Sequence, residues 1–205
     1  MLFSDADKQR IEAAVRAAEL QSTGEIVVAH VRQSARYGSE RLALAFVIAM
    51  LTSLLIAVFY PAVVSLYVLA AQLVSFGLTW ALLGVPVFGR MLLRPTQFDD
   101  AVRARAAQFF SEHGVHATRD RTGVLILLSE LEHRVVILGD SGINAKLGVN
   151  AWGDYVRVMT EAVRKGEAGQ GVVTVIAALS ETLARHFPRR ADDVNELPDA
   201  VVNDP

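Results

Sequence analysis

Two short polar segments carry the residues with the clearest capacity for chemistry. Arg119, Asp120 and Arg121 come just before one run of apolar residues, and Asp140 follows a second run, within the sequence Gly-Asp-Ser-Gly. Two carboxylates, with backbone carbonyls and water, suit a hard divalent cation such as Ca²⁺ or Mg²⁺. Guanidinium groups beside them suit a phosphate or another anion. Asp120 and Asp140 are therefore candidate metal ligands, and Arg119 and Arg121 are candidate anion-binding residues.

The strands expected around these segments bring them together. Residues 124–129 read Val-Leu-Ile-Leu-Leu-Ser and predict a buried strand, and residues 135–138 read Val-Val-Ile-Leu and predict a second. The short polar turn between the two runs predicts an antiparallel hairpin. In such a pair the start of the first strand lies beside the end of the second. Asp120 and Asp140 are thus expected at one edge of the sheet.

A structural role fits the same residues. Asp120 can cap a turn, and Asp140 can pair with Arg119 or Arg121. The two segments lack the density of oxygen ligands found in a dedicated calcium loop such as an EF-hand. The metal site and the structural role are therefore both left open.

No catalytic residue is assigned. The chain has no cysteine, so a thiol nucleophile and a thiolate metal site are excluded. No serine and histidine can be placed as a nucleophile and its base. The spacing of a metal motif such as His-Glu-x-x-His is missing from His113, His116, His133 and His186.

A long apolar run divides the chain. No charged residue or histidine lies between Arg41 and Arg90. A helix needs about 20 apolar residues to cross the hydrocarbon core, so this run can cross twice. Pro61 favours a turn near its midpoint, which predicts one crossing at residues 42–59 and another at 66–84. The alternative is a buried helical hairpin in a large soluble core.

Basic residues flank this run on both sides. Arg36 and Arg41 precede it, Arg90 and Arg94 follow it, and the turn near Pro61 has no lysine or arginine. The positive-inside rule then places both termini in the cytoplasm, with the flanking basic residues against anionic lipid headgroups. We expect a multi-pass protein of a bacterial inner (cytoplasmic) membrane.

The flanks predict one α/β domain. Helices are expected at residues 5–20, 98–113, 151–165 and 171–186, and a further strand at 25–31, rich in β-branched residues. One strand cannot form a stable sheet alone, so its partners must follow the apolar run. The last residues, from 188, are polar and acidic and are expected to form a loop or tail, either solvated or docked on the domain or on a partner. The formal net charge of −2 gives no reason to expect nucleic acid as a partner, and the charged N-terminus lacks the apolar stretch of a signal peptide.

The ordered set of motifs resembles the TPM domain family, named after a thylakoid lumen protein, a photosystem II repair protein and a nematode receptor modulator. The resemblance lies in FFSEHGVHATRDRTGVLILLSELEHRVVILGDSGI, in Trp152 and the following helix, and in the opening segment that ends STGEIVVAHV. It implies an α/β sandwich with a central mixed sheet flanked by helices, here interrupted by a two-helix transmembrane hairpin. The expected divisions are 1–40 and 95–187 for the domain, 41–94 for the hairpin and 188–205 for the acidic tail.

The resemblance also carries functional expectations. Family members are reported to bind calcium at this end of the sheet, and some plant members are described as phosphatases. We expect a binding or accessory factor for membrane proteins or complexes, with a divalent cation at the sheet edge and with the bilayer, membrane proteins or a second copy as partners. The competing hypothesis is a membrane-tethered, metal-dependent acid phosphatase, in which the arginines hold phosphate and a metal polarises it for attack by water.

Overall fold

The structure is a computed structural model that describes residues 2–35, 37–85, 95–148 and 150–204. The chain divides into two units, Met1–Ser34 with Phe98–Pro205, and Ala35–Gln97. The first unit holds the sheet and the second holds the apolar hairpin. Each is described by itself below.

The first unit is built on a mixed four-stranded sheet in the order β3-β2-β1-β4. Its strands are β1 (Glu25–Val31), β2 (Gly123–Ser129), β3 (Arg134–Gly139) and β4 (Val202–Asp204). β1 runs parallel to β2 and β4, whereas β2 and β3 form the expected antiparallel hairpin. β1 comes before the apolar hairpin and β2 comes after it, so the two flanks of the hairpin fold together.

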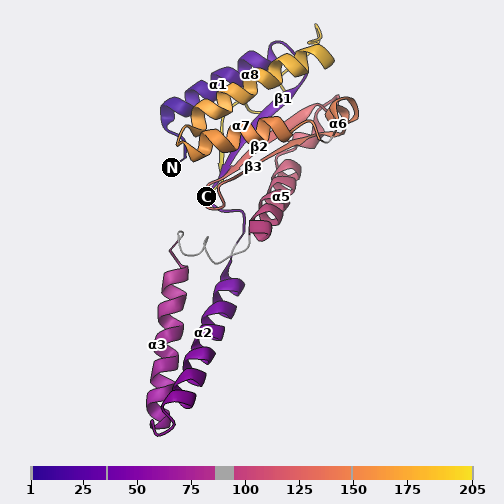
Figure 1. The fold of residues 1–205 in the computed structure, drawn as a ribbon. Coiled ribbons are helices and arrows are strands. Elements are labelled where there is room, and N and C mark those ends of the chain that lie inside the picture. Colours follow the sequence, from indigo (N-terminus) through magenta and orange to yellow (C-terminus); the bar gives the residue numbers. More distant parts are fainter. Residues whose placement is uncertain (1, 36, 86–94, 149, 205) are drawn as a thin grey trace. The chain divides into compact units, whose positions relative to one another are not determined.

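Helices cover both faces of this sheet. Figure 1 shows α1 (Asp5–Glu19), α7 (Gly153–Arg164) and α8 (Ala168–His186) on one face and α5 (Pro95–Glu112) on the other. Apolar side chains alternate along the strands, so that Ile26 and Val28 of β1 pack toward the first set of helices and Val27 and Ala29 toward α5. β2 is buried on both faces, as expected of a central strand. The predicted fold class, an α/β sandwich with a mixed sheet, is confirmed.

Local sequence explains where the helices begin and end. The side chain of Ser4 accepts a hydrogen bond from the Asp7 backbone, and the Asp7 carboxylate accepts one from the Ser4 backbone, which forms a capping box at the start of α1. Gly114 follows α5 with φ of 66°, the left-handed conformation expected at this position. A short 3₁₀ helix, η1 (Val115–Ala117), then leads to the segment before β2.

The second unit contains two apolar helices, α2 (Gly38–Phe59) and α3 (Ser65–Leu83). Both are long and apolar enough to cross a membrane, which agrees with the predicted hairpin in type and in position. Most of their large apolar side chains are exposed, whereas the small residues Ala45 and Ala49 of α2 are buried. Close packing at small residues is typical of helices that associate in a bilayer.

Two elements differ from the sequence-based expectation. A seven-residue helix, α6 (Ser141–Leu147), begins where only the end of a strand is predicted. Its start depends on Asp140 as the N-cap, a role that the Gly-Asp-Ser-Gly sequence also permits. The final residues include β4, which pairs with β1, whereas the sequence alone indicates a loop or tail. Three residues are too few for a recognisable strand pattern, so the pairing partner decides this element.

Candidate functional site

The candidate site lies at the sheet edge where β2 begins and β3 ends. The Asp140 amide donates to the Gly123 carbonyl at 2.8 Å, and the Gly142 amide donates to the Arg121 carbonyl at 3.1 Å. A Cβ on Gly142 would lie 2.6 Å from the Asp120 carbonyl oxygen, so only glycine fits there. The loop that carries Asp120 and the loop that carries Asp140 therefore lie against each other.

Asp140 has one satisfied and one unsatisfied carboxylate oxygen. Its Oδ1 accepts hydrogen bonds from the Ser141 amide at 2.5 Å and from the Ser141 hydroxyl at 3.1 Å. Its Oδ2 is buried and has no hydrogen-bond partner in the described part of the chain. A buried carboxylate oxygen without a partner is costly, and a bound cation would satisfy it. The pairing of Asp140 with Arg119 or Arg121, one of the structural alternatives, does not occur.

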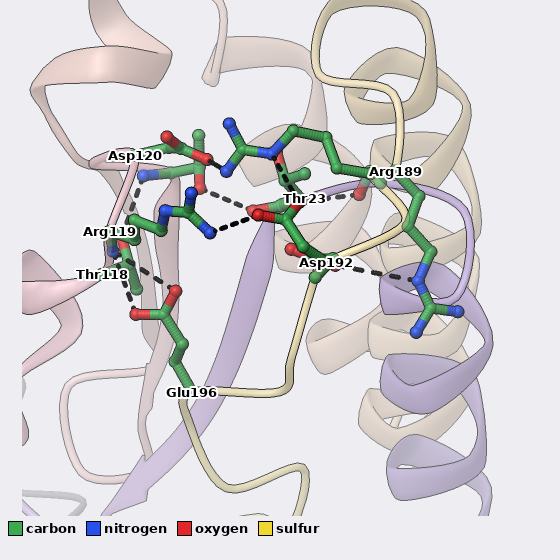
Figure 2. A network of polar contacts seen from close by, with 12 residues as sticks. Thr23, Thr118, Arg119, Asp120, Arg189, Asp192 and Glu196 are labelled. Atoms are coloured by element: carbon green, nitrogen blue, oxygen red, sulfur yellow. Dashed lines mark hydrogen bonds and ion pairs between the residues drawn. The ribbon is translucent and has the colours of Figure 1, made fainter.

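Asp120 and Arg119 both contact the last residues of the chain. We call residues 188–204 the C-terminal segment. The Asp120 carboxylate accepts a hydrogen bond from the Arg190 guanidinium. Arg119 donates its backbone amide to the Glu196 carboxylate at 2.9 Å and its guanidinium to Asp192 at 2.8 Å. Figure 2 shows the C-terminal segment reaching over the loop with these opposite charges.

The charges of this network are complementary at each point. A cation of the C-terminal segment lies on the candidate metal ligand Asp120, and two of its anions lie on the candidate anion-binding residue Arg119. The hydrogen bond with Asp192 raises the pKa of Arg119 and lowers that of Asp192. The C-terminal segment thus lies against both the candidate metal ligand Asp120 and the candidate anion-binding residue Arg119.

Arg121 has a different environment. Its backbone has φ of 56°, a left-handed conformation that is unusual for a residue with a side chain. Its guanidinium donates to the carbonyl of His116, and its carbonyl accepts from Gly142. Arg121 therefore holds η1 and the two site loops together, while Arg119 lies among acidic groups.

Two buried carboxyl groups lie close to this edge and were not singled out by sequence. Glu25, the first residue of β1, accepts the amides of Glu196 and Leu197, each at 3.3 Å. Burial raises the pKa of Glu25 to about 7, and burial raises the pKa of Glu19 to about 8, where the charge of Glu25 adds to the effect. The Glu19 carboxylate accepts the Ile26 amide at 3.0 Å. An acidic residue at the start of a strand that is mostly apolar is the signal that could have identified Glu25.

The donors fit a hard cation better than a transition metal. The available groups are carboxylate and carbonyl oxygens of Asp120 and Asp140 and their neighbours, which suit Ca²⁺ or Mg²⁺. Within residues 2–35, 37–85, 95–148 and 150–204, no three side chains of His, Cys, Asp or Glu gather as a metal cluster. Any cation at this edge would thus rely on backbone oxygens and water for much of its coordination.

One of the predicted membrane-flanking arginines can be placed. Arg41, near the start of α2, donates to the Trp80 carbonyl of α3 at 3.0 Å, and its guanidinium lies 4.6 Å from the centroid of the Trp80 ring. Arginine and tryptophan together are typical of the boundary between hydrocarbon and headgroups. Arg36, Arg90 and Arg94 lie outside the described residues.

Comparison with known proteins identifies the domain. The sequence model of the family described as the TPM domain matches residues 91–182. Residues 91–182 therefore correspond to a TPM domain. The match includes both loops of the candidate site, whereas β1 and the C-terminal segment, which complete the sheet, lie outside it.

The fold of the chain is also similar to that of a solved structure. The NMR structure of the BA42 protein from the psychrophilic bacterium Bizionia argentinensis is similar with a TM-score of 0.62 and 20% sequence identity, over 98% of this chain and 95% of that one. At this identity the likeness concerns the fold. No curated protein matches the chain.

Proposed function

We propose that this chain is an integral membrane protein whose TPM domain acts as an accessory module for membrane proteins or complexes. The pairing of β1 with β2 over seven residues carries the proposal. These strands stand on either side of the hairpin in sequence, so the domain closes only when both ends of the hairpin emerge on the same side of the membrane. The hairpin then anchors a folded domain at the surface of the bilayer.

The same proposal places both termini in the cytoplasm. Basic residues flank the hairpin and none lies in its turn, which favours a cytoplasmic location for the flanks in a bacterial inner membrane. The contact of Arg41 with Trp80 supports an interfacial position for the open end of the hairpin. In this location the domain can reach cytoplasmic parts of neighbouring membrane proteins.

A divalent cation at the sheet edge is the second part of the proposal. The unsatisfied Oδ2 of Asp140 and the carboxylate of Asp120 would hold the ion, with help from the Asp120 carbonyl oxygen that faces Gly142. The ion would join the two loops and supply a fixed positive charge at the domain surface. It would compete with Arg190, which now lies on Asp120.

Calorimetry on the full-length protein in detergent tests this part. We expect saturable binding of Ca²⁺ or Mg²⁺ that is lost in Asp140→Asn and weakened at least tenfold in Asp120→Asn. Asp154→Asn is the matched control, because Asp154 is an exposed carboxylate on α7 that forms an ion pair with Arg157, away from the sheet edge. Unchanged binding in Asp140→Asn would exclude the proposed ligands, and equal losses in all three variants would indicate a general charge effect.

A membrane-tethered acid phosphatase is the second candidate. The observation in its favour is Arg119, whose amide and guanidinium together bind two carboxylates and would suit a phosphate ester. A cation at Asp120 and Asp140 would polarise that phosphate. A phosphate-ester assay on the calorimetry samples separates the two functions. Turnover that falls by orders of magnitude in Asp140→Asn, with the fold intact, would favour the phosphatase over the accessory function.

A further inference from the structure

The free edge of β3 offers unpaired backbone groups. The Asp140 amide bonds to the Gly123 carbonyl, so these residues form a hydrogen-bonded pair of the antiparallel ladder. Bonded and non-bonded pairs alternate, which makes Val135, Ile137 and Gly139 non-bonded residues whose amides and carbonyls point away from β2. The Gly139 carbonyl accepts the side-chain amide of Asn144. Among the residues that the structure describes, the backbone groups of Val135 and Ile137 have no strand partner, because β3 is the last strand of the sheet.

This edge forms the floor of a groove. A cavity of about 710 Å³ runs along all of β3, with Val102 and Arg103 of α5 on one side and Val156 and Thr160 of α7 on the other. Trp152 lies at its end, and its ring fits against Gly139 so closely that a Cβ there would overlap it. Side walls that combine apolar and polar side chains, with a polar backbone floor, are the features of a site that accepts an added strand.

The walls decide between the candidate occupants. A second copy of this domain would present its own β3 edge flanked by its own α5 and α7, and those helices would collide with the walls. A single extended peptide carries no such helices. Peptide strands also supply the alternating amides and carbonyls that the Val135 and Ile137 backbone lacks.

The charge of the groove selects the kind of peptide. Arg134 is paired with Asp99 at 2.6 Å, whereas Arg103 is exposed and makes no ion pair or hydrogen bond with any described residue. The groove therefore has one positive charge in excess. We propose that the β3 groove binds an extended peptide with an acidic side chain opposite Arg103, by adding it to the sheet as a further strand.

This site would give the accessory module its contact with a partner protein. The origin of the peptide rests on the proposed accessory function, whereas the geometry of the groove does not. β3 and β4 are opposite edges of the sheet, so the groove lies at the other edge from β4. If the protein binds the peptide but no cation, only the cation proposal is contradicted. If it binds a cation but no peptide, only the groove proposal is contradicted.

Binding is tested with an array of blocked heptapeptides that carry Val or Ile at alternate positions and Glu, Thr or Lys at the others. The protein is full-length, in detergent, with Trp80→Phe so that Trp152 is its remaining tryptophan. We expect saturable binding of Glu-containing peptides with a change in Trp152 fluorescence, at least tenfold weaker binding of Lys-containing peptides, and slower hydrogen exchange at the Val135 and Ile137 amides. Absence of binding at millimolar peptide, or equal affinity for Glu and Lys peptides, would overturn the proposal.

A matched pair of variants tests the mode of binding. Val135→Pro removes an outward amide and no ladder hydrogen bond, whereas Val135→Ala removes the side chain and keeps the amide. We expect at least tenfold weaker binding in Val135→Pro only, and loss of the Glu preference in Arg103→Glu. If Val135→Pro fails to fold, peptides methylated on alternate backbone nitrogens replace it. Strand addition would be contradicted if peptides methylated on either set of alternate nitrogens bound as well as the unmethylated peptide. Dimerisation through β3 without peptide binding would also contradict it.

Discussion

Arg190 donates a hydrogen bond to the carboxylate of Asp120, 70 residues earlier in the chain. Each side chain is about two-fifths exposed or less, so this is a partly solvated ion pair at the protein surface. Pairs of this kind contribute about 0–1 kcal/mol to stability, because water competes for both charges. Displacement of Arg190 from Asp120 by a ligand therefore costs little free energy.

The first prediction concerns this competition. Arg190→Ala should strengthen Ca²⁺ or Mg²⁺ binding about fivefold, because removal of a contact worth ~1 kcal/mol frees the Asp120 carboxylate. Calorimetry on the full-length protein measures the change. Arg189→Ala is the control for net charge, since Arg189 lies beside it and pairs with Asp193 at 3.7 Å. Equal effects of the two substitutions would show that the Asp120 contact is irrelevant to cation binding.

The second prediction concerns the contact between the two site loops. Gly142→Ala should lower the free energy of unfolding by about 1–3 kcal/mol, because its Cβ would lie 2.6 and 2.7 Å from the carbonyl oxygens of Asp120 and Arg121. Gly153→Ala is the matched control, since a Cβ there meets no atom within 4 Å. Chemical denaturation in detergent provides the comparison. A loss in Gly142→Ala no larger than in Gly153→Ala would contradict the packing described.

The third prediction concerns pH. Burial raises the pKa of Glu25 to about 7 and that of Glu19 to about 8 from ordinary values near 4.5, so the folded state binds more protons than the unfolded state in between. The contribution of the two groups to the free energy of unfolding is therefore at its maximum below about pH 4.5. This contribution is lost progressively as pH rises from about 4.5 through 7 to 8.

Unfolding measured from pH 5 to pH 8.5 tests that trend. Glu25→Gln keeps an acceptor for the Glu196 and Leu197 amides and should flatten the decline in stability with pH. Glu161→Gln is the control, because Glu161 is an exposed residue of α7. A wild-type stability that rises across this range would show that neither carboxyl group is protonated in the folded protein.

The fourth prediction concerns topology. A reporter that is active only outside the cytoplasm should be silent when fused after Pro205 and active when inserted near Ser65, at the start of α3. The reason is that positive charge flanks the hairpin and is missing from its turn. Insertion between α7 and α8, near Gly166, is the matched internal control and should be silent. The opposite pattern of activity would contradict the cytoplasmic location of the two termini.

Much of the fold can be predicted because its patterns are local. The apolar run, the β-branched residues of β1 and the buried run of β2 each indicate their element from neighbouring residues alone. The antiparallel pairing of β2 and β3 follows from the short turn between them. α6 and β4 escape such reasoning, since seven and three residues carry too little periodic pattern to stand out.

The candidate site is predictable only in part. That the loops of Asp120 and Asp140 adjoin follows from the hairpin geometry, and the structure agrees. That Arg121 faces a backbone carbonyl and Arg119 faces the C-terminal segment depends on how side chains turn in three dimensions. The binding of a cation, a phosphate or a partner protein stays a prediction.

The sequence by itself determined the apolar hairpin, the three long strands and the residues with capacity for chemistry, because burial and membrane insertion depend on the local density and period of apolar side chains. Only the tertiary structure decided which groups face those residues. The C-terminal segment reaches Asp120 and Arg119 because β4 pairs with β1, and Glu19 and Glu25 lose water because that segment and the sheet enclose them. Charge pairing and desolvation depend on distances between residues far apart in the chain, which no local pattern specifies.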